Sequence, residues 1–192
     1  MIIGITGGTG SGKTTVLKLL AEQGCTVLDC DAIYHDLLKT DRAMLDAIDN
    51  RFPGTVADGI LDRKKLGSIV FADKTALQDL NQITHSAVKK EVQRHLDKSQ
   101  LIAIDAIGLF EGGLAELCDL TVAVSAPEDL RVLRLMARDN ISEEYARARI
   151  SAQRPAAEFE KLCDYTLHND STESDFQEKC LAFFREQGII KA

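Results

Sequence analysis

A dense run of glycines near the start of the chain is followed by a lysine and two threonines. The segment GITGGTGSGKTTV spans residues 4–16, and Gly7 to Thr14 fit the pattern G-x-x-x-x-G-K-[ST] at every fixed position. Glycines permit positive φ angles and let backbone N–H groups approach phosphate oxygens closely. The ammonium group of Lys13 can neutralise phosphate charge, and the hydroxyl group of Thr14 can ligate Mg²⁺. The pattern therefore predicts a site for a nucleoside triphosphate.

Acidic residues follow two of the predicted strands, at the edge where ligands bind in open α/β sheets. Asp31 lies just past the second strand, where a carboxylate can orient an acceptor hydroxyl and take its proton. Position alone is equally compatible with Asp31 capping the next helix. Asp105 is the last residue of the third strand, the place where P-loop enzymes hold Mg²⁺ through an acid. The alternative role for Asp105 is to cap a helix or a turn.

Arginines are concentrated in one segment of the chain. Six of the eleven arginines fall between residues 131 and 154: Arg131, Arg134, Arg138, Arg147, Arg149 and Arg154. The first three share one face of a predicted helix. The opposite, apolar face would consist of Leu130, Leu133, Met136 and Ala137. Arginines that close over a triphosphate would neutralise its charge and exclude water. The alternative is a solvated helix face paired with glutamates, and it fits Arg131 and Arg147 best.

The elements that would position these residues follow from apolar runs rich in β-branched residues. We expect five strands, at 2–6, 26–30, 101–105, 120–124 and 165–168. The segments between them have helical periodicity, and near-continuous apolar strands that alternate with helices indicate a parallel sheet. The fold class is thus predicted as α/β, with a P-loop NTPase-type five-stranded parallel sheet and helices on both faces.

Two longer segments interrupt this alternation within what we interpret as a single domain, residues 1–192. Residues 31–100 are too long for one crossover helix and contain several helical patterns, which predicts an inserted helical lobe. Residues 139–161 form a smaller helical insertion, in which Ser142 before Glu143 is typical of a helix start. We interpret the first insertion as a substrate lobe and the second as a small lid.

Composition narrows the class of protein. The chain has 192 residues, a formal net charge of −7 at pH 7 and 45% hydrophobic residues, which is ordinary for a globular protein. The acidic balance argues against a nucleic-acid partner, and no apolar run is long enough to predict a membrane span. Five scattered cysteines suggest reduced thiols in a cytoplasmic protein. The sequence makes no prediction of the oligomeric state.

Taken together, these segments resemble the dephospho-CoA kinase family over nearly the whole chain. The segment DGILDRKKLGSIVFAD at 58–73 is similar to the family's G-x-L-D-R-x-x-L-x-x-x-V-F-x-D, and RLMARDNISEEYARARISAQ at 134–153 is similar to its lid segment. Lys161, Asp164 and Asn169 fit the ending of the family pattern. The resemblance implies transfer of the ATP γ-phosphate to the 3′-hydroxyl of the dephospho-CoA ribose, with ATP and Mg²⁺ as cofactors and dephospho-CoA as the substrate.

The resemblance also implies roles for individual residues. Asp31 would be the base on the acceptor hydroxyl, Lys13 would act on the phosphates, and Arg138 would be a lid arginine on the transferring phosphate. The implied ATP-binding residues are the loop, the start of the following helix and the lid arginine: Gly8, Gly10, Ser11, Gly12, Lys13, Thr14, Thr15, Val16 and Arg138. Thr14 would ligate the metal. The implied acceptor side comprises Asp31, His35, His85 and Asp105.

The chain departs from the family pattern on the acceptor side. His35 stands where the family usually has arginine, and Ile107 and Gly108 replace a proline and a leucine. A histidine is a weaker phosphate anchor than an arginine. Asn140 replaces the lid glycine, and asparagine can still adopt a left-handed conformation. Two alternatives therefore stay open: another small-molecule or nucleotide kinase of the P-loop class, and an ATP-binding module with weak catalysis.

Overall fold

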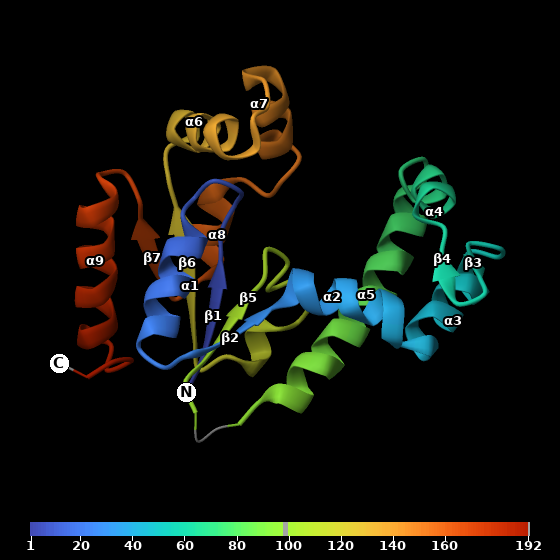
Figure 1. Cartoon of the computed structure of the whole chain (residues 1–192), viewed down its shortest axis with the longest axis horizontal. Helices are drawn as coiled ribbons and strands as arrows, with labels where there is room; N and C mark the ends of the chain where they lie inside the picture. Colours follow the sequence, from blue (N-terminus) through green and yellow to red (C-terminus); the bar gives the residue numbers. More distant parts are fainter. Residues whose placement is uncertain (98–99, 192) are drawn as a thin grey trace. The chain divides into compact units, whose positions relative to one another are not determined.

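The structure is a computed structural model that describes residues 1–97 and 100–191 (Figure 1). The chain divides into two compact units. The first unit comprises Met1–Leu28, Asp97–Phe110 and Leu114–Ala192. The second comprises Asp29–Leu96 and Glu111–Gly113. Within the described residues, none of the helices is both long enough and apolar enough to span a membrane.

The first unit is built on a five-stranded sheet. Its strands are β1 (Ile2–Thr6), β2 (Thr26–Asp29), β5 (Ile102–Asp105), β6 (Leu120–Ser125) and β7 (Tyr165–His168). Their order across the sheet is β2-β5-β1-β6-β7. β1 pairs in parallel with β5 and β6, and β6 pairs in parallel with β7. All five strands predicted from apolar runs are present, so the predicted α/β class is confirmed.

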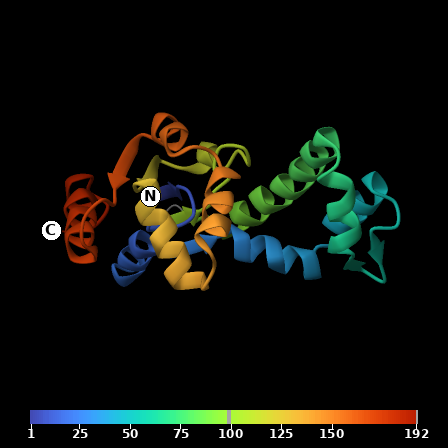
Figure 2. The ribbon, with the colours of Figure 1, turned by 90° about the horizontal axis from the view of Figure 1, so that it is seen from above.

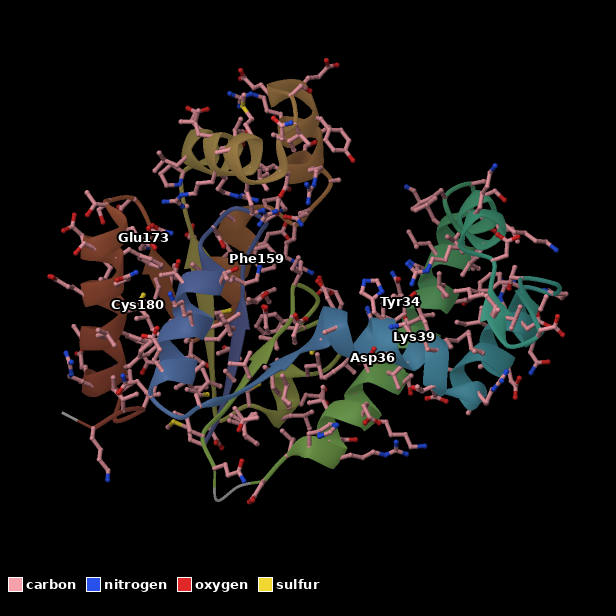
Figure 3. All side chains as sticks on the ribbon, in the orientation of Figure 1. Tyr34, Asp36, Lys39, Phe159, Glu173 and Cys180 are labelled. Atoms are coloured by element: carbon pink, nitrogen blue, oxygen red, sulfur yellow. The ribbon has the colours of Figure 1, made fainter. Side chains whose placement is uncertain are left out.

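The main apolar cluster lies on one face of this sheet. Ile3 and Ile5 of β1 pack there with Val16 of α1 (Lys13–Glu22) and with Phe176 and Cys180 of α9 (Glu173–Glu186). Figure 3 labels Cys180 on α9, next to α1. Because successive strand residues point to opposite faces, this cluster takes every second residue of β1.

The other face of the sheet is covered by α8 (Ala156–Leu162). Ser125 of β6 donates a hydrogen bond from Oγ to Oε1 of Glu160 at 2.6 Å, and Phe159 is buried. Figures 1 and 2 show α1 and α8 on opposite sides of the sheet, as the predicted two-sided covering requires. Residues 156–161, assigned to the lid from sequence, are therefore part of the layer that packs on the sheet.

A helix pair, α6 (Glu128–Asp139) and α7 (Glu143–Ser151), follows β6. The two helices pack through a small cluster of apolar side chains: Val132, Leu135, Ala146 and Ile150. Asn140 ends α6 with φ 52° and ψ 48°, the left-handed conformation expected for it, and Ser142 caps α7 as predicted. The predicted apolar face of α6 is wrong, because Leu133 is 60% exposed and Arg131 is buried instead.

The second unit contains four helices within its described residues: α2 (Cys30–Thr40), α3 (Arg42–Arg51), α4 (Arg63–Val70) and α5 (Lys74–His95). An aspartate caps the start of each helix, with its carboxylate accepting a hydrogen bond from a first-turn N–H group: Asp29, Asp41, Asp62 and Asp73. The sequence predicts a helical lobe, but the unit also contains two short strands. A hairpin of β3 (Val56–Ala57) and β4 (Ile60–Leu61) joins α3 to α4.

Candidate active site

The phosphate loop lies between the end of β1 and the first residue of α1. Lys13 begins α1, as predicted, and its Nζ donates a hydrogen bond to the carbonyl oxygen of Gly7 at 2.8 Å. Gly12 caps the helix with φ 107°, and a Cβ there would collide with Nδ2 of Asn169. Both the backbone angle and the close approach therefore require glycine at position 12. The free N–H groups at the start of α1 favour an anion in front of it.

Two arginines of α6 hold the outer side of this loop. Nε of Arg131 donates to the carbonyl oxygen of Thr9 at 2.8 Å, and Nη1 of Arg134 donates to that of Gly10 at 3.3 Å. A carbonyl and the N–H group that follows it point in opposite directions, so the bond to Thr9 turns the N–H group of Gly10 away from Arg131. The N–H group of Ser11 donates to the carbonyl oxygen of Gly8 at 3.2 Å. Arg131 is only 5% exposed. The interpretation of Arg131 as part of a solvated face is therefore wrong.

Asn169, directly after β7, connects the sheet to the loop. Its backbone N–H donates to the carbonyl oxygen of Ser125 at 2.7 Å, and its Nδ2 donates to that of Ser11 at 2.8 Å. Its Oδ1 accepts a hydrogen bond from Nη2 of Arg134 at 3.0 Å. Asn169 is 5% exposed, so these bonds are shielded from water. The sequence placed Asn169 in a family pattern but indicated no role for it.

Gln153 contributes a further contact to the loop. The backbone N–H of Thr9 donates to Oε1 of Gln153 at 2.8 Å. Because Arg131 binds the carbonyl oxygen of the same residue, both backbone polar groups of Thr9 are held by side chains that lie beyond β6 in the chain. The segment from α6 to the end of α7 is thus anchored on the phosphate loop itself.

A pocket of about 200 Å³ lies over the loop. It is lined by loop residues 8–14, by Ile107, and by Arg134, Leu135 and Arg138 of α6. The structure thus brings most of the predicted ATP-binding residues together with the predicted lid arginine. Thr15 and Val16 do not line this pocket. Val16 is fully buried in the sheet core, so its side chain does not reach this pocket, and its assignment to ATP binding stays a prediction.

Arg138 is held at the pocket by its neighbour Asp139. Nε and Nη2 of Arg138 bond the two carboxylate oxygens of Asp139 at 2.7 and 2.9 Å, and Nη1 of Arg149 bonds Oδ2 at 2.6 Å. These bonds raise the pKa of Arg138 and lower the pKa of Asp139. Arg147 lies instead on an exposed surface, paired with carboxylates as its alternative interpretation predicts: Glu128, Asp129 and Glu143.

Asp105 ends β5 at the carboxyl edge of the sheet. It is half-buried and stands in register with Ile5, one residue before β1 ends. This position agrees with the predicted place of Asp105, while its role as an acceptor-side residue stays a prediction. Within residues 1–97 and 100–191, no group of three or more histidine, cysteine, aspartate or glutamate residues is arranged to hold a metal ion.

Asp31 lies in the second unit, in the first turn of α2, and is exposed. The residue that caps α2 is Asp29, not Asp31. Oδ1 of Asp29 accepts a hydrogen bond from the backbone N–H of Ala32 at 3.0 Å. The capping alternative for Asp31 is therefore wrong, and Asp31 is instead an acid in the first turn of the helix.

The two predicted acceptor-side histidines occupy separate places in the second unit. His35 is exposed on α2, and its Nδ1 lies 3.4 Å from Nη2 of Arg63. His85 of α5 lines a groove of about 430 Å³ together with Gln82 and Glu111. His35 is not one of the described residues that line this groove.

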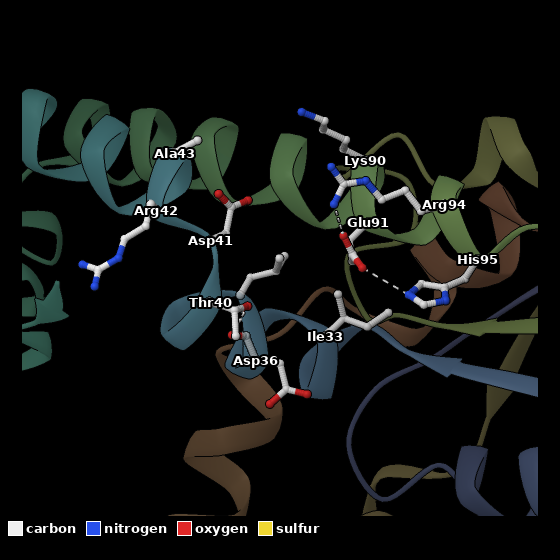
Figure 4. A pocket seen from close by; sticks show the side chains of 11 residues that line it. Ile33, Asp36, Thr40, Asp41, Arg42, Ala43, Lys90, Glu91, Arg94 and His95 are labelled. Atoms are coloured by element: carbon white, nitrogen blue, oxygen red, sulfur yellow. Dashed lines mark hydrogen bonds and ion pairs between the residues drawn. The ribbon is translucent and has the colours of Figure 1, made fainter.

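A larger groove of about 520 Å³ runs between α2, the start of α3 and the end of α5 (Figure 4). Glu91 in this groove binds Arg94 at 2.8 Å and His95 at 3.1 Å. Asp36, which Figure 3 also labels, contributes from α2. With about 100° between successive helix residues, the α2 side of this groove is nearly opposite Asp31. The groove is therefore distinct from the predicted acceptor residues of α2.

Known proteins match the chain over nearly its full length. The family model described as dephospho-CoA kinase (CoaE) matches residues 1–175. A dephospho-CoA kinase from Lactobacillus johnsonii is 33% identical over 193 residues, which cover 97% of this chain and 98% of that protein. A crystal structure of a Thermus thermophilus protein has a TM-score of 0.81 and 34% identity, with 97% of each chain covered. A dephospho-CoA kinase from Campylobacter jejuni has a TM-score of 0.70 and 25% identity, with 98% of each chain covered.

Proposed function

The chain belongs to the dephospho-CoA kinase family, as its motifs predict, and on that basis we propose that it phosphorylates the ribose 3′-hydroxyl of dephospho-CoA with ATP. This would be the last step of coenzyme A synthesis. The main structural support is the pocket over the phosphate loop, which Lys13, Arg134 and Arg138 line together. Phosphoryl transfer needs positioning and charge neutralisation more than covalent chemistry, and these groups supply both.

The side chains of this pocket have complementary tasks in the proposal. The inward N–H groups of the loop and the start of α1 bind the phosphates, and Lys13 neutralises their charge. Arg138, fixed by Asp139, stabilises the negative charge that spreads over the transferring phosphate. A cation placed before the reaction starts does not need to reorganise during it, which lowers the barrier.

Thr14 is the proposed protein ligand for Mg²⁺. It lines the pocket in the first turn of α1 and is exposed. Mg²⁺ keeps several waters and is usually bound by carboxylates together with substrate phosphates. In P-loop enzymes the hydroxyl group of the loop's Ser or Thr is a further ligand, which is the role proposed for Thr14. When bound, the ion neutralises charge on the phosphate that is transferred.

Asp31 is the proposed proton acceptor, and the second unit is the proposed substrate lobe. Since Asp29 caps α2, the exposed carboxylate of Asp31 is not the cap of that helix. A carboxylate that orients a hydroxyl group and takes its proton contributes about 10²–10⁴-fold in rate. We also assign His35, His85 and Asp105 to the acceptor side. Of the predicted lid segment 139–161, we assign residues 139–155 to the lid, because α8 packs on the sheet.

The proposal is tested by incubating the protein with ATP, Mg²⁺ and dephospho-CoA. We expect ADP and coenzyme A to form in equal amounts, with the new phosphate on the 3′-oxygen by phosphorus NMR. ADP formation no faster than without the acceptor would refute the assigned substrate. A panel of AMP, nucleosides and sugars then identifies another kinase, and tight ATP binding without transfer to any acceptor identifies a binding module.

A further inference from the structure

Arg131 is a buried cation beside the phosphate loop. Its Nε bonds a carbonyl oxygen of the loop, and its Nη2 is buried without a hydrogen-bond partner. Burial lowers the pKa of Arg131, and the negative charge of Glu128 partly offsets this decrease. Glu128 itself binds Arg147 at 3.2 Å. In the part of the chain that the structure describes, no carboxylate is paired with Arg131.

The position of this guanidinium group is fixed by the loop rather than by solvent. A Cβ at Gly8 would collide with Nη2 of Arg131, so the group lies directly against the backbone of Gly8 while its Nε holds Thr9. Arg138, by comparison, lines the pocket, which Arg131 does not, and its side chain is 58% exposed. Water and salt screen an exposed charge far more than a buried one.

A buried cation without a paired anion destabilises a folded chain. This cost falls when an anion binds nearby, and the loop that Arg131 contacts is built for a polyanion. We propose that the triphosphate of the bound nucleotide is the counter-ion of Arg131, which strengthens nucleotide binding from the outer side of the loop. The inference rests on the proposed function, because ATP is the ligand in question.

A purely structural role for Arg131 makes a different prediction. If the side chain served only to hold Thr9, its removal would lower the stability of the free protein and weaken nucleotide binding together. If it is a cation awaiting its counter-ion, removal of the charge relieves the free protein and weakens only the complex. Stability of the free protein and affinity for ATP then change in opposite directions or independently.

The experiment compares Arg131→Met with Arg131→Lys in the full chain. We expect Arg131→Met to raise the Kd for ATP with Mg²⁺ at least about tenfold, equivalent to about 1.4 kcal/mol, in isothermal titration calorimetry. The Tm of the free protein should stay unchanged or rise, and the increase in Tm on adding ATP should shrink. Arg131→Lys keeps the charge, so its Kd should stay within about threefold of the original.

Arg185→Met is the control, since it removes an exposed arginine of α9 that does not line the pocket over the phosphate loop. Its Kd for ATP should not change. An unchanged Kd for Arg131→Met, or a lower Tm with equal losses of affinity in both Arg131 variants, would overturn the inference. If Arg131→Met fails to fold, Arg131→Gln gives the same comparison. An original chain that binds no ATP would refute the proposed function, and the inference with it.

Discussion

The phosphate loop and the start of α2 both contain residues with predicted chemistry, yet the structure restrains them to different degrees. Loop carbonyl oxygens accept hydrogen bonds from Lys13, Arg131 and Asn169. Asp31 and His35 of α2 are exposed, and the polar contact of His35 is a 3.4 Å approach to Arg63. The nucleotide side is therefore preorganised within the first unit, whereas Asp31 and His35 lie on an exposed surface of the second.

This difference has a consequence for how substitutions should act. A residue within the loop network affects the geometry of several N–H groups at once, so its loss should change nucleotide affinity. A residue on the surface of α2 is not part of such a network, so its loss should change only the step in which it takes part. For residues that do not act on the transferred phosphate, changes in affinity for ATP should thus identify the loop network. Changes in turnover number should identify the surface of α2.

The largest effect is expected for Arg138→Met, which removes a cation that lines the loop pocket. We expect kcat to fall about 10³-fold or more, the lower end of the range for an arginine on a transferring phosphate, while the Kd for ATP changes less. Steady-state kinetics and calorimetry measure the two quantities. Arg185→Met serves as control. A loss of kcat below about tenfold would show that Arg138 does not act on the transferred phosphate.

Asp31→Asn should have the next largest effect and should act on turnover alone. We expect kcat to fall about 10²-fold or more with an unchanged Kd for ATP, because a general base is lost while the loop is intact. Asp36→Asn is the control, since Asp36 is exposed on a different face of the same helix. If Asp31→Asn weakened ATP binding and left kcat unchanged, Asp31 would belong to the nucleotide side and the comparison would fail.

The sequence predicts the nucleotide side well because its signals are local. Apolar runs specify the strands, and a glycine-rich pattern between a strand and a helix specifies the loop. The hairpin of the second unit had a local signal too. Asp58 and Gly59 both have positive φ angles, 52° and 74°, and Asp-Gly between short apolar runs is typical of a tight hairpin turn.

Contacts that depend on the packing of distant segments were not predictable in the same way. The spacing of Arg131, Arg134 and Arg138 is the same for a face turned to solvent and for a face turned to the loop. A weak signal existed for Arg131, since Glu128 is the only acid at the spacing of three or four residues at which helical side chains pair. The bond of Asn169 to Ser11 joins residues 158 positions apart, which no local pattern contains.

Asn169→Ala tests the loop network at a position outside the pocket. The change leaves the carbonyl oxygen of Ser11 without its Nδ2 donor, and it leaves Nη2 of Arg134 with only the 3.5 Å bond to the backbone carbonyl oxygen of residue 169. We expect a cost of about 1–3 kcal/mol in the free energy of unfolding. We expect the Kd for ATP to rise about tenfold, with a smaller change in kcat. His168→Ala is the control, because that side chain is exposed. Wild-type affinity in Asn169→Ala would show that the loop keeps its geometry without this anchor.

The last prediction concerns the reactivity of the cysteine thiols of the first unit, which should affect function least. Burial raises the pKa of Cys25 and Cys163 to about 11, and that of Cys118 and Cys180 to about 12. The neutral thiol is favoured in the folded state. This contribution to stability is therefore complete below the unfolded pKa of about 9 and is lost as the pH rises towards 11–12.

A consequence at ordinary pH is low thiol reactivity, even though the proposed acceptor itself carries a thiol. At pH 8 a shift of the pKa from 9.0 to about 11 lowers the thiolate fraction about 100-fold. We expect these four cysteines to react with a disulfide reagent about 100-fold or more slowly in the folded protein than in urea, with each site followed by mass spectrometry. Equal rates in both states would mean that this unit opens readily. The preorganised nucleotide side would then lack the rigid core on which the comparison depends.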